Sequence, residues 1–120
     1  MNNTYGEVYV NGVIYDNTTY PFLVLNPQYF KRGVYFITGI LIHEMVHIYC
    51  FENNIEDTNY KTGYHNIKFK LACEKNNLKC RKGDYGYNNV VVTPYVKNIV
   101  DDILKKIELT NTISKYVNNI

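Results

Sequence analysis

The chain has 120 residues, of which 46% are hydrophobic and 20% are charged, and its formal net charge is +2. This composition is typical of a globular protein rather than a disordered one, and the length allows a single domain, residues 1–120, with one modest core. The N-terminus has no basic region followed by an apolar run, and no apolar run approaches the ~20 residues that span a membrane, so we expect a cytoplasmic protein that does not associate with membranes.

The first part of the chain predicts a β-hairpin. Two short runs of alternating character, 7–10 and 13–15, flank Asn11-Gly12, a dipeptide that is a strong hairpin-turn signal. Residues 22–25 follow as a short buried strand. We therefore expect antiparallel β structure before the first helix.

Two helical segments come next. Asn26-Pro27 has the form of an N-cap and a first helical position, and it predicts a brief helical turn that ends near Phe30. A longer helix is predicted from about Val34 to Phe51, an interval in which Glu44 is the single charged residue. Such a helix is buried on most of its surface.

This helix carries His43-Glu44-x-x-His47. Two histidines four residues apart lie about one turn apart on one helix face, so both imidazoles can hold the same metal ion. Glu44 can reach the remaining position of that metal, where a water binds, and act as a general base. Alternatively, the three residues satisfy one another inside an ordinary core helix. Buried polar groups cost free energy unless they are paired or coordinated, which favours the metal.

The second half of the chain contains two more predicted helices. Residues 53–63 are polar and aperiodic and form a loop, and a helix follows from about His65 to Asn77. Residues 81–89 are rich in turn-forming residues, and 90–92 form a short extended piece.

The last predicted helix is amphipathic. Thr93-Pro94 caps it, and its apolar stripe extends to about residue 109. A domain of this size needs that stripe for its core, so we expect the helix to pack on its own domain.

A catalytic zinc usually has three protein ligands and one open position. His65 is the candidate for the third ligand, because it is the remaining histidine in the chain and follows a loop long enough to fold back. Glu74 is an alternative, but it lies ~180° from His65 around the predicted helix at ~100° per residue, so both cannot face the metal. An ordinary surface histidine is the other interpretation of His65.

Charge is unevenly distributed. Residues 41–60 contain four acidic residues and no basic ones, whereas residues 61–82 contain seven basic residues and one acidic one. A basic segment beside a candidate site suits a polyanion such as DNA, although a solvated surface is the alternative. The three cysteines, Cys50, Cys73 and Cys80, have neither zinc-ribbon nor redox spacing, and we expect buried thiols.

Residues 41–51 and the later run Gly63-Tyr64-His65-Asn66-Ile67-Lys68-Phe69 resemble the SprT-like (Spartan) metallopeptidase domain. In that family an apolar helix with His-Glu-x-x-His is followed by a polar loop, and then by a histidine with phenylalanine four residues later in a basic helix. The resemblance covers roughly residues 22–80, and Asn66 stands where the family often has glycine.

The resemblance implies an α+β fold of the minimal zincin-like type. In this fold a short antiparallel sheet packs on the motif helix and on a second ligand-bearing helix, and here a C-terminal amphipathic helix follows. It also implies a zinc-dependent endopeptidase in which His43, His47 and His65 bind Zn²⁺ and Glu44 is the catalytic base. Its substrates would be proteins or peptides, including DNA-associated proteins reached through residues 61–82.

An additional donor should stabilise the oxyanion of such a reaction. The candidates near the motifs in the sequence are Tyr49, Tyr60 and Tyr64. The alternative function is a non-catalytic, zinc-stabilised binding module, such as a phage or mobile-element protein that interacts with DNA or a host protein.

Overall fold

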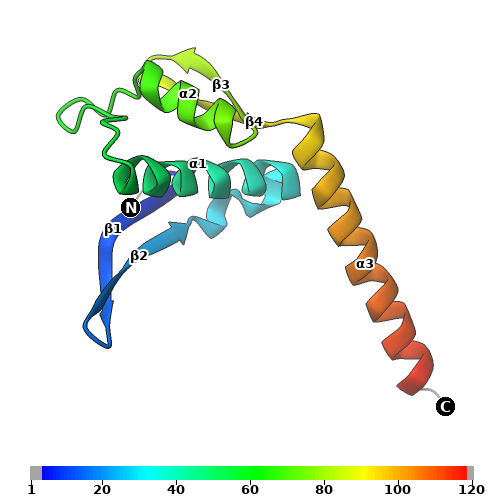
Figure 1. The fold of residues 1–120 in the computed structure, drawn as a ribbon. Coiled ribbons are helices and arrows are strands. Elements are labelled where there is room, and N and C mark those ends of the chain that lie inside the picture. The colour runs from blue at the N-terminus through cyan, green and yellow to red at the C-terminus, as the bar shows by residue number, and fades with distance from the viewer. Residues whose placement is uncertain (1–3, 119–120) are drawn as a thin grey trace.

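The computed structural model describes residues 4–118 and shows a mixed α+β fold (Figure 1). The elements are β1 (Gly6–Tyr15), β2 (Thr18–Leu25), a 3₁₀ helix η1 (Pro27–Arg32), α1 (Val34–Glu52), α2 (Ile67–Lys75), β3 (Leu78–Gly83), β4 (Gly86–Val92) and α3 (Pro94–Asn118). Within this part of the chain there are two antiparallel two-stranded sheets, β1–β2 and β3–β4. Helix α1 lies between the β1–β2 hairpin on one side and α2 with β3–β4 on the other (Figure 1).

The first hairpin turns at Asp16-Asn17, so the prediction of a turn at Asn11-Gly12 was wrong. Asp16 and Asn17 both have positive φ, 49° and 59°, which is the geometry of a type I′ turn. Three residues of β1, 10–12, instead form a bulge opposite Pro21 of β2. Proline has no N–H to donate to the ladder, so a bulge is a suitable place for it. The predicted strand 22–25 consequently pairs with the first half of β1.

Helix α1 begins and ends within one residue of the predicted limits. The preceding cap is also confirmed, because the Asn26 side chain accepts a hydrogen bond from the Gln28 N–H at 3.1 Å. The short helix that it caps continues to Arg32, two residues beyond the predicted end. Gly33, with φ of 102°, then separates the two helices.

Among residues 4–118, α1 is also the one helix long and apolar enough to cross a membrane by length and composition, with a mean hydropathy of 1.5. The expectation that no such segment exists was therefore wrong at the level of composition. Core helices of soluble proteins have the same composition when other elements cover them. Here neighbouring elements cover His43 and Glu44 and four other residues of α1, whereas Leu41, Met45 and Phe51 are exposed, so the expectation of a helix buried on most of its surface was wrong.

The main core lies on the side of α1 that faces α2, β3 and β4. Its buried members come from all four elements and from the start of α3: Val46, Cys50, Phe69, Ala72, Cys73, Leu78, Cys80, Val92, Val96 and Val100. All three cysteines are buried free thiols, as predicted.

Helix α2 begins two residues later than predicted, so His65 lies before the helix and not in it. The Asn66 side chain accepts hydrogen bonds from the N–H groups of Lys68 and Phe69, at 2.9 and 3.2 Å, and caps the helix. An asparagine at this position therefore has a structural role that glycine would not supply. Farther along, the predicted turn region 81–89 does contain a turn, at residues 84–85, and the rest of it forms the ends of β3 and β4.

Helix α3 continues well past residue 109 and projects from the body of the protein (Figure 1). Of its apolar stripe, Val96 and Val100 are buried, whereas Ile99, Ile103, Leu104 and Ile107 are between 42% and 52% exposed. The expectation that the whole stripe packs on its own domain was therefore wrong. Only the first two turns of α3 reach the core.

Candidate metal centre

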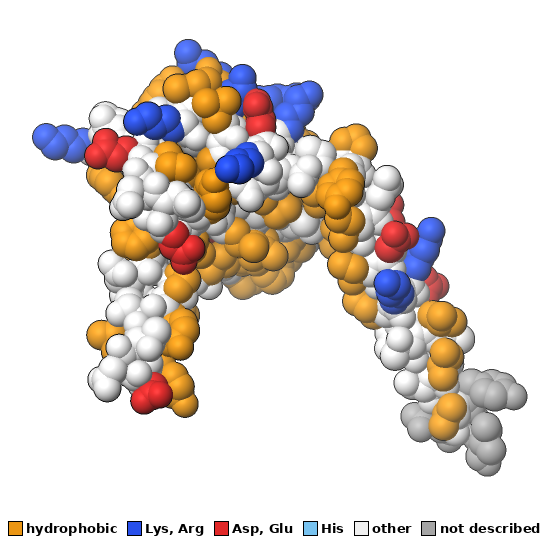
Figure 2. Space-filling view, in the orientation of Figure 1, with side chains coloured by type: hydrophobic (Ala, Val, Ile, Leu, Met, Phe, Trp, Pro, Cys, Tyr) orange, Lys and Arg blue, Asp and Glu red, His pale blue; other side chains and the backbone are white. Residues whose placement is uncertain are grey.

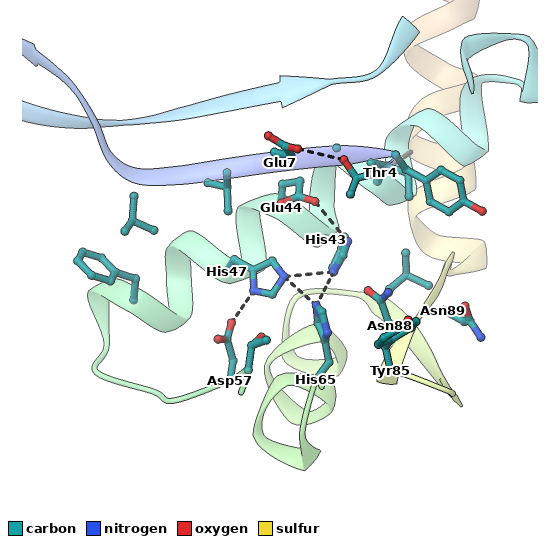
Figure 3. A pocket seen from close by; sticks show the side chains of 18 of the residues that line it. Thr4, Glu7, His43, Glu44, His47, Asp57, His65, Tyr85, Asn88 and Asn89 are labelled. Atoms are coloured by element: carbon teal, nitrogen blue, oxygen red, sulfur yellow. Dashed lines mark hydrogen bonds and ion pairs between the residues drawn. The ribbon is translucent and has the colours of Figure 1, made fainter. Parts of the chain in front are cut away.

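Three histidine side chains converge on one point. The Nε2–Nε2 distances are 3.2 Å between His43 and His47, 3.2 Å between His47 and His65, and 3.4 Å between His43 and His65 (Figure 3). Imidazole nitrogens that lie about 2.0–2.1 Å from a tetrahedral Zn²⁺ are about 3.3 Å from one another. The triangle thus has the size that three ligands of one such ion require.

The second ring nitrogens show which tautomers face the centre. His65 Nδ1 is 2.9 Å from the Gly63 carbonyl oxygen, which can only accept, so Nδ1 carries the proton. His47 Nδ1 lies 2.6 Å from Asp57 Oδ2, again with the imidazole as donor. The Nε2 atoms of both rings then present lone pairs to each other. Facing lone pairs repel unless a cation lies between them, so this donor set fits a divalent metal that prefers imidazole.

His65 is held in place by β4. Its N–H donates to the Tyr85 carbonyl at 2.9 Å, and its carbonyl accepts from the Tyr87 N–H, also at 2.9 Å. Between them lies Gly86, with φ of 76°, and a Cβ built there would be 2.0 Å from the His65 oxygen. Close backbone contact with this glycine, rather than the start of α2, positions the third histidine.

Asp57 was not among the candidate site residues predicted from the sequence. It is 8% exposed, and its carboxylate holds the Nδ1 side of His47. Burial favours a higher pKa for this carboxyl, but the hydrogen bond and charge interaction with His47, helped by the nearby Thr58 and Cys50 side chains, leave the pKa below its ordinary value. In the sequence, the one feature that pointed to Asp57 was its position as a carboxylate in the loop between the second and third histidines.

Glu44 is 5% exposed and lies on α1 beside the histidines, with Glu7 of β1 above it (Figure 3). The pKa of the Glu44 carboxyl is raised to about 7, mainly by burial, while His47 opposes the rise and Glu7 adds to it. Its Oε1 is 3.6 Å from His43 Nδ1, which is too long for a hydrogen bond. A carboxyl of this pKa can both accept and release a proton near neutral pH.

The pKa values of His43 and His65 lie below the ordinary value. Burial is the main cause in both cases, and the neighbouring histidines act in the same direction. The neutral imidazole favoured in this way is the form that binds metals.

Several other candidates lie elsewhere. Glu74 forms an ion pair with Lys70 at 3.7 Å on α2 and does not join the cluster. Tyr49 packs against the core, and Tyr60 lines the cavity described below but is 93% exposed. Tyr64 does not line that cavity.

The histidine cluster opens into a cavity of ≈ 1500 Å³. One wall comes from β1, including Glu7 and Tyr9, and another comes from β4, including Asn88 and Val90. The cavity is therefore a cleft between β1 and β4 with the histidines and Glu44 at its base.

No protein-family model, no curated protein and no solved structure matches this chain.

Proposed function

We propose that this chain is a zinc-dependent endopeptidase of the SprT-like type, with a minimal zincin-like fold formed by residues 1–120 and with the cytoplasm as its compartment. The observation that carries the proposal is the convergence of three Nε2 atoms, 3.2 to 3.4 Å apart, beside a buried carboxyl whose pKa is about 7. His43, His47 and His65 would hold the metal, and Glu44 would act as the catalytic base.

Zn²⁺ supplies a Lewis acid that lowers the pKa of a bound water toward ~7 and polarises a carbonyl. Glu44 accepts a proton from the attacking water as the water oxygen bonds to the peptide carbonyl carbon. The same carboxyl then transfers this proton to the leaving nitrogen as the C–N bond breaks. One water is consumed, and the products are a carboxylic acid and an amine.

The shape of the site supports a polypeptide substrate. The cleft is open and lies between the edges of β1 and β4, so an extended chain can cross the base where the histidines and Glu44 lie. Exposed strand edges present unpaired backbone groups, which can hydrogen-bond to a peptide main chain.

DNA-associated proteins are the proposed substrate class. Basic side chains gather over α2 and β3, on the face of the body turned away from the β1–β2 hairpin (Figure 2). The contributing segment is 61–82, whose basic residues are exposed except for the half-buried Lys70. If the segment binds DNA, affinity for DNA will be highest at low salt and will fall as salt rises. Absence of binding at low salt would remove DNA from the proposal.

The second candidate is a zinc-stabilised binding module without turnover. The exposed apolar stripe of α3 favours this alternative, because uncovered apolar surface marks many interaction sites. Turnover distinguishes the two functions.

The first experiment measures metal bound per chain by elemental mass spectrometry. We expect about one zinc in the wild-type protein and much weaker binding in His65→Ala, whereas Glu74→Ala should bind zinc like the wild type. Zinc retained in His65→Ala would contradict the assigned third ligand. No metal in the wild type after zinc addition would contradict the centre itself.

The second experiment compares cleavage of an unfolded protein by the wild type and by Glu44→Gln. We expect Glu44→Gln to lose cleavage while it keeps its zinc and its circular dichroism spectrum, because the amide cannot accept the proton. Equal cleavage by both proteins would show that the peptidase proposal is wrong. A wild type that binds zinc and cleaves nothing would support the binding module.

A further inference from the structure

Strand β4 contains a bulge next to the metal centre. Between two paired positions, Lys82 alone on β3 opposes both Tyr87 and Asn88 on β4. A bulge of this kind changes the direction of a side chain and is frequent beside active sites. Here Tyr87 packs against the core, whereas Asn88 lines the cleft.

The bulge brings Asn88 close to the histidines. The preceding N–H, that of Tyr87, donates to the His65 carbonyl at 2.9 Å, so Asn88 directly follows the contact that holds the third histidine. Asn88 lies on the side of His43 and His65, across the cluster from Asp57 (Figure 3).

The side chain of Asn88 is available to bind a ligand. It is half-buried and lines the cleft, and its amide forms no hydrogen bond with any residue from 4 to 118. The amide is therefore free to bind a group of a ligand that occupies the cleft, in place of water.

We propose that Asn88 Nδ2 donates a hydrogen bond to the carbonyl oxygen of the scissile peptide as negative charge develops on that oxygen. This inference rests on the proposed peptidase function and names its oxyanion donor. A neutral amide keeps its N–H donors at every pH, and β4 fixes the backbone position from which the Asn88 side chain reaches into the cleft. The candidate tyrosines lack this placement, since Tyr49 is in the core and Tyr60 is 93% exposed.

The test uses Asn88→Ala, Asn88→Asp and the adjacent variant Asn89→Ala in the full-length zinc-loaded protein. Asn89 also lines the cleft, but it is exposed and is a matched control for changes at the rim. We expect kcat to fall about 10²–10³-fold in both Asn88 variants, with little change in KM, because a single oxyanion donor contributes this much. Asn89→Ala should keep most of the activity, and zinc content should not change in any variant.

Binding supplies a readout that does not depend on turnover. In the Glu44→Gln background, isothermal titration calorimetry compares a peptide phosphinate, which mimics the tetrahedral anion, with the uncleaved peptide of the same sequence. Asn88→Ala should weaken phosphinate binding by a factor similar to its effect on kcat and should change peptide binding much less.

The outcomes separate the two proposals. If the wild type cleaves peptides but Asn88→Ala matches Asn89→Ala in kcat and in phosphinate affinity, the inference on Asn88 is wrong and the peptidase proposal stands. Wild-type activity in Asn88→Asp would also contradict the donor role. Loss of zinc from Asn88→Ala would show a structural role instead. A wild type that cleaves no more than Glu44→Gln would overturn both proposals.

Discussion

The two histidines with a resolved Nδ1 partner owe their orientation to groups outside the motif. Asp57 orients His47, and the Gly63 carbonyl orients His65. Both contacts place the proton on Nδ1 and leave Nε2 free to coordinate. The cluster is therefore arranged for a metal by hydrogen bonds that exist in the protein itself.

Asp57→Asn tests this arrangement. The variant keeps the size of the side chain but replaces the carboxylate with a neutral amide, so His47 becomes a weaker and less firmly oriented ligand. We expect zinc affinity to fall about 10–100-fold, the usual effect of losing such a partner. Competition with a chromophoric chelator measures it. Asp84→Asn, in the exposed β3–β4 turn, is the control, and equal affinities for the two variants would contradict the role of Asp57.

Glu44 should give the metal-free protein a pH-dependent stability. Its pKa is raised from 4.5 to about 7 in the folded state, so its contribution is complete below pH 4.5 and is lost as the pH rises through 7. The loss is on the order of 3 kcal/mol. In Glu44→Gln this contribution is absent.

Urea unfolding between pH 4 and pH 8, with a chelator present, measures this effect. His43 and His65 titrate in both proteins, so the difference between wild type and Glu44→Gln isolates residue 44. We expect the unfolding free energy of the wild type minus that of Glu44→Gln to decrease as the pH rises. A difference that stays constant over the range would show that the Glu44 pKa is not raised.

At the scale of elements, α2 packs the Phe69 ring against all three histidines, and β4 fixes the backbone of His65. The backbone of His65 bonds to Tyr85 and Tyr87 on either side of Gly86, and the bulge that follows turns Asn88 into the cleft. Strand β4 thus positions the candidate ligand His65 and presents Asn88 beside it. The register of the β3–β4 pairing shifts near the start of β4, where this bulge and the glycine contact lie.

Gly86→Ala should displace His65. The added Cβ would lie 2.0 Å from the His65 carbonyl oxygen, and backbone on both sides cannot move away by changing a rotamer. We expect zinc binding in Gly86→Ala to be as weak as in His65→Ala. Elemental mass spectrometry and thermal unfolding measure the effect.

Gly33→Ala is the control. Gly33 also has a positive φ, 102°, it lies before α1, and an added Cβ meets nothing within 4 Å. It should therefore show only the backbone cost, about 1–3 kcal/mol, with zinc retained. Zinc binding in Gly86→Ala equal to that in Gly33→Ala would contradict the positioning role of β4.

At the scale of the whole molecule, α3 is largely separate from the body. The radius of gyration is 17.3 Å, whereas a compact chain of this length has about 14 Å. Contact with the body is concentrated in the first turns, where Val96 and Val100 are buried, the Tyr35 hydroxyl bonds to Asp101, and Lys97 lies over the Tyr35 ring. The histidine cluster lies in the body.

Removal of residues 105–120 should therefore leave the centre intact. We expect zinc stoichiometry to be unchanged and the midpoint of thermal unfolding to move by only a few degrees, since none of the described side chains in the deleted turns belongs to the buried core. Removal of residues 96–120 is the contrasting variant, because it deletes Val96 and Val100 from the core. That truncation should destabilise the protein strongly. Zinc loss on removal of 105–120 would show that α3 supports the body.

The sequence alone determined the parts of this protein that depend on local patterns. The limits of α1, its two histidines and Glu44, and the cap at Asn26 all follow from spacing along a helix or from a single capping position, and the structure has them within a residue or two. His65 was identified as a candidate ligand because the chain offers no other histidine, although its place before α2 was not foreseen.

The tertiary structure decided what depends on segments meeting across the fold. Three features arise where a loop and β4 pack against α1. These are the contact of Asp57 with His47, the close backbone approach at Gly86 and the direction of the Asn88 side chain. No fixed spacing in the sequence predicts such long-range contacts, because the free energy of closing a loop depends only weakly on the length of the loop. Likewise, the hairpin turns at Asp16-Asn17 and not at Asn11-Gly12, because this turn gives β1 a longer pairing with β2. Helix α3 projects because only its first turns contribute buried residues to the described core. Helical spacing is a local property of the chain, whereas these choices depend on the competition among distant contacts.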